Sequence, residues 1–428
     1  MHPILFRIPL PDTPLKLWWG LVAVAVLALV YAGASWKQGA RGSGATGLVV
    51  AIAAAVGGWI WRDKAWELES LPIYSYGVML GLSLLVGWYL TLGLAERDFG
   101  SEHKETLANC YIATAFSAIV MARLLYVVTN LDEFSSLSDV FNIRRGGLVA
   151  YGGFLGGFLG SLLFLRAHGL RLMPWADVAV PSLASGLMIT RIGCYMFGCD
   201  FGKPLSDDAP AWLKSLGTFP RWDEGTLAHA TGSPAWVQHV QQRGLSLQST
   251  ESLPVHPTQL YESAVGLALL VLLLFLRRRQ MFRGQLFLVF TFAYGIARFA
   301  LEILRDDAER GAYGPMLGAH VLLPLSFLAF AIAYSASFAR AIADKTLRTV
   351  TRILSFIPAI VAFLALRPSS FASEELIQLS TSQWVGLTTG IAAAVAYAIF
   401  HKAAELHPKS AMEVGLALRK PMTEAQGG

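Results

Sequence analysis

Long apolar runs recur along the chain and constrain its fold more than any other feature. A helix of about 20 apolar residues spans the hydrocarbon core of a bilayer. Only 15% of the residues are charged and 54% are hydrophobic, whereas about 25% are charged in an average soluble domain. The sequence therefore predicts an all-α integral membrane protein, a multi-span helical bundle. We place eleven spans at residues 17–35, 47–61, 73–94, 107–129, 148–165, 175–194, 258–276, 285–304, 315–336, 347–366 and 384–401.

Basic residues in short loops predict the orientation of these spans, because loops rich in Lys and Arg stay in the cytoplasm. They gather after the seventh span, after the ninth span and in the tail, at Arg277, Arg278, Arg279, Arg283, Arg340, Lys345, Arg348, Lys402, Lys409, Arg419 and Lys420. All fall on one side, which places the N-terminus outside and the C-terminus in the cytoplasm. Because loop topology accounts for the net charge of +5, we expect no nucleic-acid partner.

The first span has a second interpretation. Ala32-Gly33-Ala34 resembles the cleavage site of a signal peptide. Cleavage would invert the orientation of every later span, so we expect an uncleaved helix.

The span at 285–304 carries a polar stripe on an otherwise apolar helix. Tyr294, Arg298, Glu302 and Arg305 fall within an arc of roughly 80° at helical spacing. A charge facing hydrocarbon costs about 3 kcal/mol or more, so the stripe must face protein or a wet cavity. A structural pair between Arg298 and Glu302, four residues apart, is one interpretation. It does not explain why Tyr294 and Arg305 lie on the same line.

A glycine-rich block opens the fifth span, from Gly146 to Gly157. Its four-residue glycine spacing, as in Gly152 and Gly156, is typical of membrane helices that pack closely. The same backbone could instead approach a lipid headgroup, because arrays of backbone N–H groups bind anions and Arg144 and Arg145 directly precede the block. Both interpretations stay open.

Arg191 lies near the outer end of the sixth span, in the block from Thr190 to Pro204. An arginine at the end of a span can extend to the headgroup region without a specific partner. Its planar guanidinium is equally suited to grip two oxygens of a phosphate. The polar segment that follows, residues 195–257, is too long for a linker and predicts an extracytoplasmic subdomain or lid.

The block from Val255 to Glu262 begins the seventh span. Thr258 suits a helix start, and Glu262 in the first turn suits the positive end of the helix dipole. His256, Gln259 and Glu262 recur at three-residue spacing and are too polar to face lipid. We expect these side chains to face the interior of the bundle.

The chain has only three cysteines, Cys110, Cys194 and Cys199. They are too few for a disulfide framework and lack the spacing of a zinc site, so we expect no metal. A bridge between Cys194 and Cys199 in an oxidising compartment stays open.

These blocks together resemble the prolipoprotein diacylglyceryl transferase family. The segment His256-Pro-Thr-Gln-Leu-Tyr-Glu262 is similar to the family's HPSQLYE, and Tyr294-Gly-x-x-Arg298-x-x-x-Glu302-x-x-Arg305 resembles its late helix. The remaining blocks are matched in order by Tyr74-Ser-Tyr76-Gly77-Val-Met79, by Gly146-Gly147-Leu with Gly152-Gly153, and by Arg191-x-Gly193 with Gly202. Five blocks in the right order on one predicted face indicate homology.

The resemblance covers roughly residues 70–340 and implies a seven-span core with one long extracytoplasmic loop. We accordingly divide the chain into three parts. They are an extra hairpin of spans at 1–69, the transferase-like core at 70–340 with its loop at 195–257, and a second extra hairpin with a basic tail at 341–428.

The chain departs from the family's pattern at several positions. Tyr151 stands where the family has a histidine that has been proposed as a base. The family's Arg-x-Gly-Asn-Phe-x-Asn-Gly-Glu has Cys194 for its first asparagine, Phe197 for its second and Cys199 for its glutamate. Its Gly-Gln-x-Leu-Ser is reduced to Gly318 with Leu325-Ser326. These departures leave activity and substrate in question.

The resemblance implies transfer of a diacylglyceryl group from phosphatidylglycerol to the lipobox cysteine thiol of a prolipoprotein. The reaction makes a thioether, releases glycerol phosphate and requires neither cofactor nor metal. Arg298 and Arg191 are our candidates for the phosphate clamp, with Arg305 as an outer helper and Glu302 holding Arg298. The thiol must react as a thiolate. The candidate base is His256 or a Tyr151 perturbed by arginines, since an ordinary phenol with a pKa of about 10 is a poor base. Glu262 is another candidate.

The other residues that we assign to the candidate site bind substrate. They are Tyr76, Gly147, Gly152, Cys194, Gly202, Gln259, Tyr261, Glu262, Tyr294 and Arg305. The implied location is a bacterial inner membrane, where membrane lipid is a partner and the site faces the extracytoplasmic side.

The sequence leaves three alternatives open. A transporter would also bury polar residues, but such proteins typically contain internal repeats and broken helices, and we find no repeat. A non-catalytic relative that binds lipid or lipoprotein is compatible with Tyr151 and Cys194. A transferase with an altered donor or acceptor is the third.

Overall fold

The computed structural model describes residues 3–9, 15–37, 41–60, 65–66, 70–134, 140, 147–222, 232–306, 311–366, 376–412 and 416. Among these residues, ten helices are long and apolar enough to cross a membrane. The prediction of a helical, multi-span membrane protein is therefore confirmed. The chain divides into two compact units, His2–Ser75 and Tyr76–Gly428 with Met1, which are described separately here.

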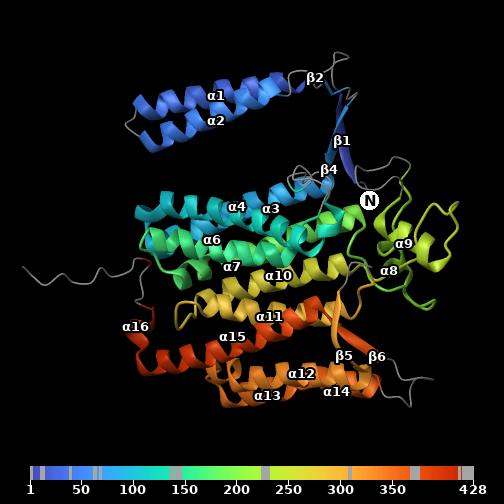
Figure 1. Cartoon of the computed structure of the whole chain (residues 1–428). Helices are drawn as coiled ribbons and strands as arrows, with labels where there is room; N and C mark the ends of the chain where they lie inside the picture. The colour runs from blue at the N-terminus through green and yellow to red at the C-terminus, as the bar shows by residue number, and fades with distance from the viewer. Residues whose placement is uncertain are drawn as a thin grey trace, which may run out of the picture. The chain divides into compact units, whose positions relative to one another are not determined.

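The first unit is a helical hairpin with two small strand pairs (Figure 1). Its elements are β1 (Ile4–Pro9), β2 (Leu15–Lys16), α1 (Leu17–Lys37), α2 (Arg41–Ile60), β3 (Ala65–Trp66) and β4 (Ser70–Tyr74), with β1 antiparallel to β4 and β2 to β3. The two helices touch closely at Gly47, where a side-chain carbon would lie 3.0 Å from the carbonyl oxygen of Ala28. The apolar part of α2, Gly47–Trp59, is shorter than the ten helices that are long enough to cross a membrane, so the predicted span at 47–61 stays a prediction.

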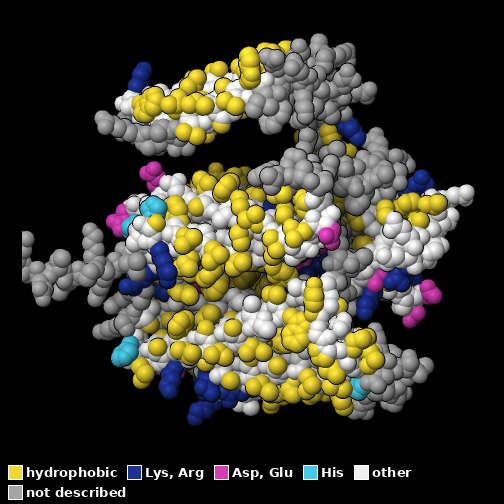
Figure 2. Space-filling view, viewed as in Figure 1, with side chains coloured by type: hydrophobic (Ala, Val, Ile, Leu, Met, Phe, Trp, Pro, Cys, Tyr) yellow, Lys and Arg dark blue, Asp and Glu magenta, His cyan; other side chains and the backbone are white. Residues whose placement is uncertain are grey.

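The main helices of the second unit run side by side in Figure 1. They are α3 (Ser75–Phe99), α4 (Lys104–Thr129), α6 (Ala150–Ala167), α7 (Leu172–Phe197), α10 (Thr258–Arg277), α11 (Gln285–Glu302), α12 (Ala319–Ala336), α13 (Lys345–Ser355), α14 (Ile357–Ala365) and α15 (Thr381–Leu406). Short helices η1 (Ser101–His103), η2 (Leu131–Glu133), η4 (Phe338–Ala341) and α16 (Pro408–Met412) adjoin them. Hydrophobic side chains cover the sides of these helices in Figure 2, as a lipid-facing surface requires.

The glycine block at the start of α6 packs that helix onto α4. A side-chain carbon on Gly152 would lie 2.4 Å from the carbonyl oxygen of Met121, and one on Gly156 would lie 2.3 Å from that of Ser117. Real atoms do not approach so closely, so only glycine allows this contact. Close helix packing is thus the interpretation that these two glycines support.

Helix α11 lies between α10 and α15 (Figure 1). Phe292 and Phe299 of α11 share one buried core with Phe330 of α12 and Tyr397 of α15. The C-terminal helix is therefore an integral part of the second unit, with its own share of the apolar core.

Two predicted spans differ in detail from the structure. The predicted span at 315–336 begins with β5 (Ala312–Gly318), which pairs with β6 (Leu376–Ser380), and its helix starts only at Ala319. Gly314 has a φ of 95° and is followed by Pro315, and neither suits a helix. The predicted span at 347–366 is broken at Phe356 into α13 and α14, because Pro358 lacks the N–H that a continuous helix needs.

The segment between α7 and α10 folds on a small core of its own. It contains α8 (Ala211–Leu216) and α9 (Pro234–Arg243), and its buried apolar residues are Phe201, Phe219, Ala235 and Val255. Its described residues thus form a packed structure.

Candidate active site

The polar stripe of α11 faces protein, as predicted. The hydroxyl of Tyr294 donates a hydrogen bond to Oε1 of Glu262 on α10 at 3.2 Å. Nη1 of Arg298 lies 3.4 Å from Oε2 of Glu262, and Nη2 of Arg305 lies 2.6 Å from Oδ1 of Asp200. The stripe therefore joins α11 to the start of α10 and to the loop that follows α7.

Three arginines and three carboxylates form one chain of ion pairs in which the charges alternate. Its members, in order, are Glu302, Arg298, Glu262, Arg191, Asp200 and Arg305. The N···O distances are 2.9 Å for Arg298–Glu302 and 3.0 Å for Arg191–Glu262. Because every charge has an opposite neighbour, the chain avoids the large penalty of an unpaired buried charge. The structural pair of Arg298 and Glu302 exists, but it is one link of a longer network.

The arginines of this chain are more exposed than the glutamates. Side-chain exposure is 17% for Arg191 and 13% for Arg298, but 4% for Glu262 and 2% for Glu302. The two glutamates are therefore more deeply buried than the arginine side chains that they contact. Within the described residues, Nη2 of Arg191 makes no hydrogen bond, although a guanidinium has five N–H donors. This arrangement presents donors to an anion.

The first turn of α10 holds the loop that carries Asp200. The hydroxyl of Thr258 donates to the carbonyl oxygen of Asp200 at 2.6 Å, and Nε2 of Gln259 donates to that of Cys199 at 2.5 Å. Gln259 is 0% exposed and Glu262 3%, so the prediction that they face inward is confirmed. Oε1 of Gln259 has no hydrogen-bond partner among the described residues.

Asp200 is a site residue that the sequence analysis missed. It is the only non-glycine residue in the described parts of the chain with positive φ, at 58°. Burial raises the pKa of its carboxyl, but Arg191, Arg305 and Arg298 outweigh burial and hold that pKa below its usual range. One signal in the sequence could have identified it. The resemblance predicts a glutamate at position 199, which is a cysteine here, and Asp200 is the next residue. A left-handed residue there turns the carboxylate toward the arginines.

Tyr151 meets Arg298 through a second residue that the sequence analysis missed. The Tyr151 hydroxyl donates to Oγ of Ser382 at 2.7 Å, and Nη2 of Arg298 donates to the same oxygen at 3.0 Å. Ser382 belongs to α15, outside the predicted core of 70–340. No motif marked it, because one serine near a helix start has many ordinary explanations.

His256 lies beside the site without joining the ion-pair chain in the described structure. Its Nδ1 lies 3.4 Å from the hydroxyl of Tyr261, and its carbonyl oxygen accepts from the N–H of Gly202 at 3.0 Å. A side-chain carbon on Gly202 would lie 2.7 Å from Cβ of His256, so glycine is required there. Burial lowers the pKa of His256, which favours the neutral imidazole.

Two predicted substrate contacts, Tyr76 and Gly147, differ in their surroundings. Tyr76 is 41% exposed, and a side-chain carbon on Gly193 would lie 3.4 Å from its ring. Gly147 has a φ of 82°, and its carbonyl oxygen accepts from Nη1 of the buried Arg123 at 3.0 Å. The sequence analysis did not single out Arg123. Like Arg298, it is a charged residue within a predicted span, here the span at 107–129, and such a residue must face protein or a wet cavity.

Some predicted features lie outside the described residues. Arg144, Arg145 and Gly146 at the start of the glycine block, and Arg419 and Lys420 in the tail, are among them.

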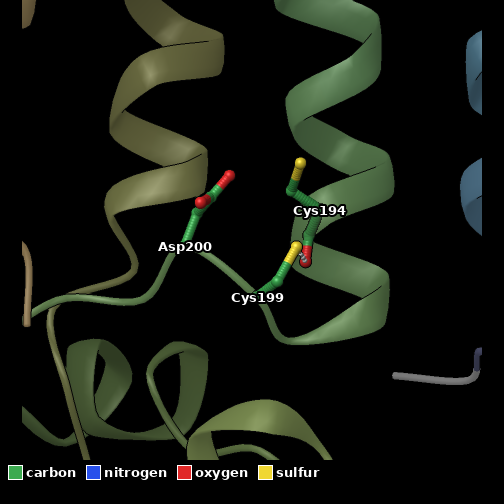
Figure 3. Close-up of side chains that lie close together, drawn as sticks. All are labelled: Cys194, Cys199 and Asp200. Carbon is green, nitrogen blue, oxygen red and sulfur yellow. Dashed lines mark hydrogen bonds between the residues drawn. The ribbon is translucent and has the colours of Figure 1, made fainter. Parts of the chain in front are cut away.

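Cys194 and Cys199 lie beside Asp200, as Figure 3 shows. Both thiols are free, and Sγ of Cys194 lies 3.8 Å from Nη1 of Arg191. The possible ligand atoms of these three residues lie within 4.8 Å of one another. Arg191 and Arg305 engage both carboxylate oxygens of Asp200, and the contact with Cys194 together with burial raises the pKa of Cys199. The donors thus suit guanidinium groups better than a metal ion.

The chain is similar to known proteins over most of its length. The sequence profile of the family described as prolipoprotein diacylglyceryl transferase matches residues 63–366. A protein of Bacillus mycoides (strain KBAB4) named phosphatidylglycerol–prolipoprotein diacylglyceryl transferase is 32% identical over 257 residues, which are 60% of this chain and 84% of the relative. Proteins of the same name from Bacillus cereus (strain ATCC 14579) and Bacillus anthracis (strain CDC 684) are 31% and 30% identical over the same shares.

Proposed function

The chain belongs to the prolipoprotein diacylglyceryl transferase family, and we propose that it transfers a diacylglyceryl group from phosphatidylglycerol to the lipobox cysteine thiol of prolipoproteins. In this reaction a carbon–sulfur bond forms, the carbon–oxygen bond to the phosphate breaks, the thiol loses its proton and glycerol phosphate leaves. The observation that carries the proposal is that the side chains of Arg191 and Arg298 are partly exposed, whereas their partners Glu262 and Glu302 are buried.

Arg298 and Arg191 clamp the phosphate in this proposal. Negative charge grows on the leaving phosphate as the carbon–oxygen bond breaks, and preoriented donors stabilise that charge. Glu262 contacts both guanidinium groups, at 3.4 Å and 3.0 Å, so one carboxylate orients the two halves of the clamp. Glu302 fixes Arg298 from behind, and Arg305 with Asp200 extends the cluster outward.

The base that takes the thiol proton is Tyr151 or His256 in this proposal. Tyr151 lies one hydroxyl away from Arg298, and partial burial lowers the pKa of His256, which favours the neutral imidazole that can accept a proton. The single substitutions Tyr151→Phe and His256→Gln distinguish the two residues, because replacing the residue that acts as the base removes most of the transfer rate. Full activity in both variants would remove both residues from this role.

Cys194, Gln259 and Tyr294 line the site around the clamp, and we propose that they contact the substrates. Cys194 stands 3.8 Å from Arg191, and the buried Oε1 of Gln259 is one acceptor for a substrate donor such as a backbone N–H. Tyr294 bonds Glu262 and supports the clamp. Gly202 and Tyr261 shape the adjoining loop through His256.

We place the protein in a bacterial inner membrane with the site on the extracytoplasmic face. The site lies at the start of α10 and the end of α11, whereas the basic residues from Arg277 to Arg283 lie at the opposite ends of the same helices. Basic loops face the cytoplasm, so the N-terminus is outside and the C-terminus inside. Labelling of single-cysteine variants at Leu247 and Arg278 in intact cells tests this, with Leu247→Cys alone reacting with an impermeant reagent.

The test of the reaction uses the purified full chain in vesicles of phosphatidylglycerol with a lipobox peptide. The expected result is a mass gain of one diacylglyceryl group on the peptide cysteine, together with release of glycerol phosphate. A peptide with serine in place of cysteine is the control. Binding of the lipid without any mass gain, under conditions in which a Bacillus relative is active, would contradict the proposal and favour a non-catalytic binder.

A further inference from the structure

A group from beyond the family-matched region completes the arginine site. The family profile ends at residue 366, and Ser382 lies in α15. Its Oγ accepts hydrogen bonds from Tyr151 at 2.7 Å and from Arg298 at 3.0 Å. The candidate base and half of the candidate clamp therefore meet at one oxygen supplied by the C-terminal part of the chain.

The position of Ser382 is fixed by the start of its helix. Ser380 and Gln383 form a reciprocal cap, in which Oγ of Ser380 accepts from the N–H of Gln383 at 3.2 Å and Oε1 of Gln383 accepts from the N–H of Ser380 at 2.9 Å. Such a cap sets the first turn of a helix. The N–H of Thr381 also donates to the carbonyl oxygen of Gly311 at 2.9 Å.

A close helix contact holds this first turn against α11. A side-chain carbon on Gly386 would lie 2.8 Å from the carbonyl oxygen of Gly295, so the two backbones touch there. Gly386 lies one turn after Ser382, and Gly295 lies one turn before Arg298. The contact sets the distance between the serine oxygen and the guanidinium.

A hydroxyl oxygen between two donors can orient both of them. Without it, Nη2 of Arg298 retains only Glu302, and Tyr151 loses its described partner. We propose that Ser382 is a positioning residue that holds Arg298 and Tyr151 for the donor's phosphodiester, and that the C-terminal helix is part of the active site of this protein. The proposal rests on the proposed function.

The test compares the full-length parent with Ser382→Ala in phosphatidylglycerol vesicles with the lipobox peptide. The loss of one hydrogen bond to a charged group predicts about a tenfold fall in kcat/KM. We expect most of this change in kcat and little in KM, because positioned groups act in the transition state. Ser382→Thr keeps the hydroxyl and restores most of the rate. In a Tyr151→Phe background the effect of Ser382→Ala shrinks, because the two residues act together.

Thr389→Ala on the same helix is the matched control. Its exposed hydroxyl bonds only to the carbonyl oxygen of Val385, at 2.6 Å, among the described residues, and its kcat/KM stays within about twofold of the parent. Thermal unfolding of each variant reports whether it folds.

The outcomes distinguish this proposal from the proposed function. A parent without transferase activity overturns the proposed function, and the proposal with it. An active parent with an equally active Ser382→Ala overturns the proposal alone. A loss of activity that Ser382→Thr does not restore, or that is unchanged in the Tyr151→Phe background, assigns Ser382 a merely structural role and also overturns it.

Discussion

Two buried polar networks lie at opposite ends of α10 and α11, and they are built differently. At one end, Asp177 of α7 is 0% exposed. Its carboxylate accepts from the backbone N–H groups of Gly284, Leu286 and Phe287 at 2.5, 2.9 and 3.2 Å, and also from the side chain of Gln280. Most of its partners are backbone groups at the start of α11, where the helix dipole favours an anion.

At the other end, the chain from Glu302 to Arg305 is made of ion pairs between side chains. Arg298 can turn toward a new anion and keep part of its contact with Glu262, because a side chain can rotate. A backbone N–H cannot do this without unwinding its helix. The comparison indicates that burial of charge alone does not mark a functional site. Side-chain pairing, with Arg298 and Arg191 exposed at 13% and 17%, is the feature that distinguishes the candidate site.

Substitution of Arg298 tests the chain of ion pairs from Glu302 to Arg305, our candidate site, and has the largest expected effect. Arg298→Lys keeps the charge but loses the planar fork that contacts Glu262, Glu302 and Ser382. We expect kcat/KM to fall by about 100-fold or more, while the thermal unfolding temperature changes little. Peptide lipidation and calorimetry in detergent measure the two quantities. Arg279→Lys, in which the parent arginine stacks on Phe275 at 4.8 Å, is the control and retains activity.

Substitution of Asp177 tests the network that this carboxylate forms with the backbone at the start of α11. Asp177→Ala leaves several backbone donors of α11 without their acceptor, so we expect a loss of stability of about 3 kcal/mol. Activity per folded molecule should stay within about twofold of the parent. A stable variant without activity would mean that the two networks do not differ as described.

The contact between α11 and α15 tests how precisely the chain of ion pairs at the candidate site is positioned. Gly386→Ala places a carbon about 2.8 Å from the carbonyl oxygen of Gly295 and must move the helices apart. We expect about a fivefold fall in kcat, since small displacements in a site are costly. Gly93→Ala is the control, because nothing lies within 4 Å of the added carbon. Equal rates in both variants would show that this spacing is unimportant.

The smallest expected effect concerns pH and His256. Burial lowers the folded pKa of His256 below its usual value of about 6.5. The unfolded chain therefore binds more protons just below that pH, and stability rises with pH through this window. We expect His256→Gln to remove this slope, seen as a change of about 2 °C in the difference in Tm between pH 5 and pH 7.5. An identical pH dependence in parent and variant would contradict a lowered pKa of His256 in the folded protein.

Much of the fold followed from the sequence alone. Apolar length predicted the membrane helices, and helical periodicity predicted that Tyr294, Arg298 and Glu302 share a face. The cost of charge in hydrocarbon then required that face to be buried, whichever partner it has. The inward orientation of Gln259 and Glu262 follows from the same rule. These conclusions depend on local geometry and on the solvent.

Only the tertiary structure decided which groups meet on that face. Asp200 supplies a carboxylate next to the expected position because its backbone adopts a left-handed conformation, which no spacing rule predicts for an aspartate. Ser382 reaches Arg298 across 84 residues of sequence and Tyr151 across 231. Periodicity predicts which side of a helix is polar. Helix packing determines which residues contact that side, here through the glycine contact between α11 and α15.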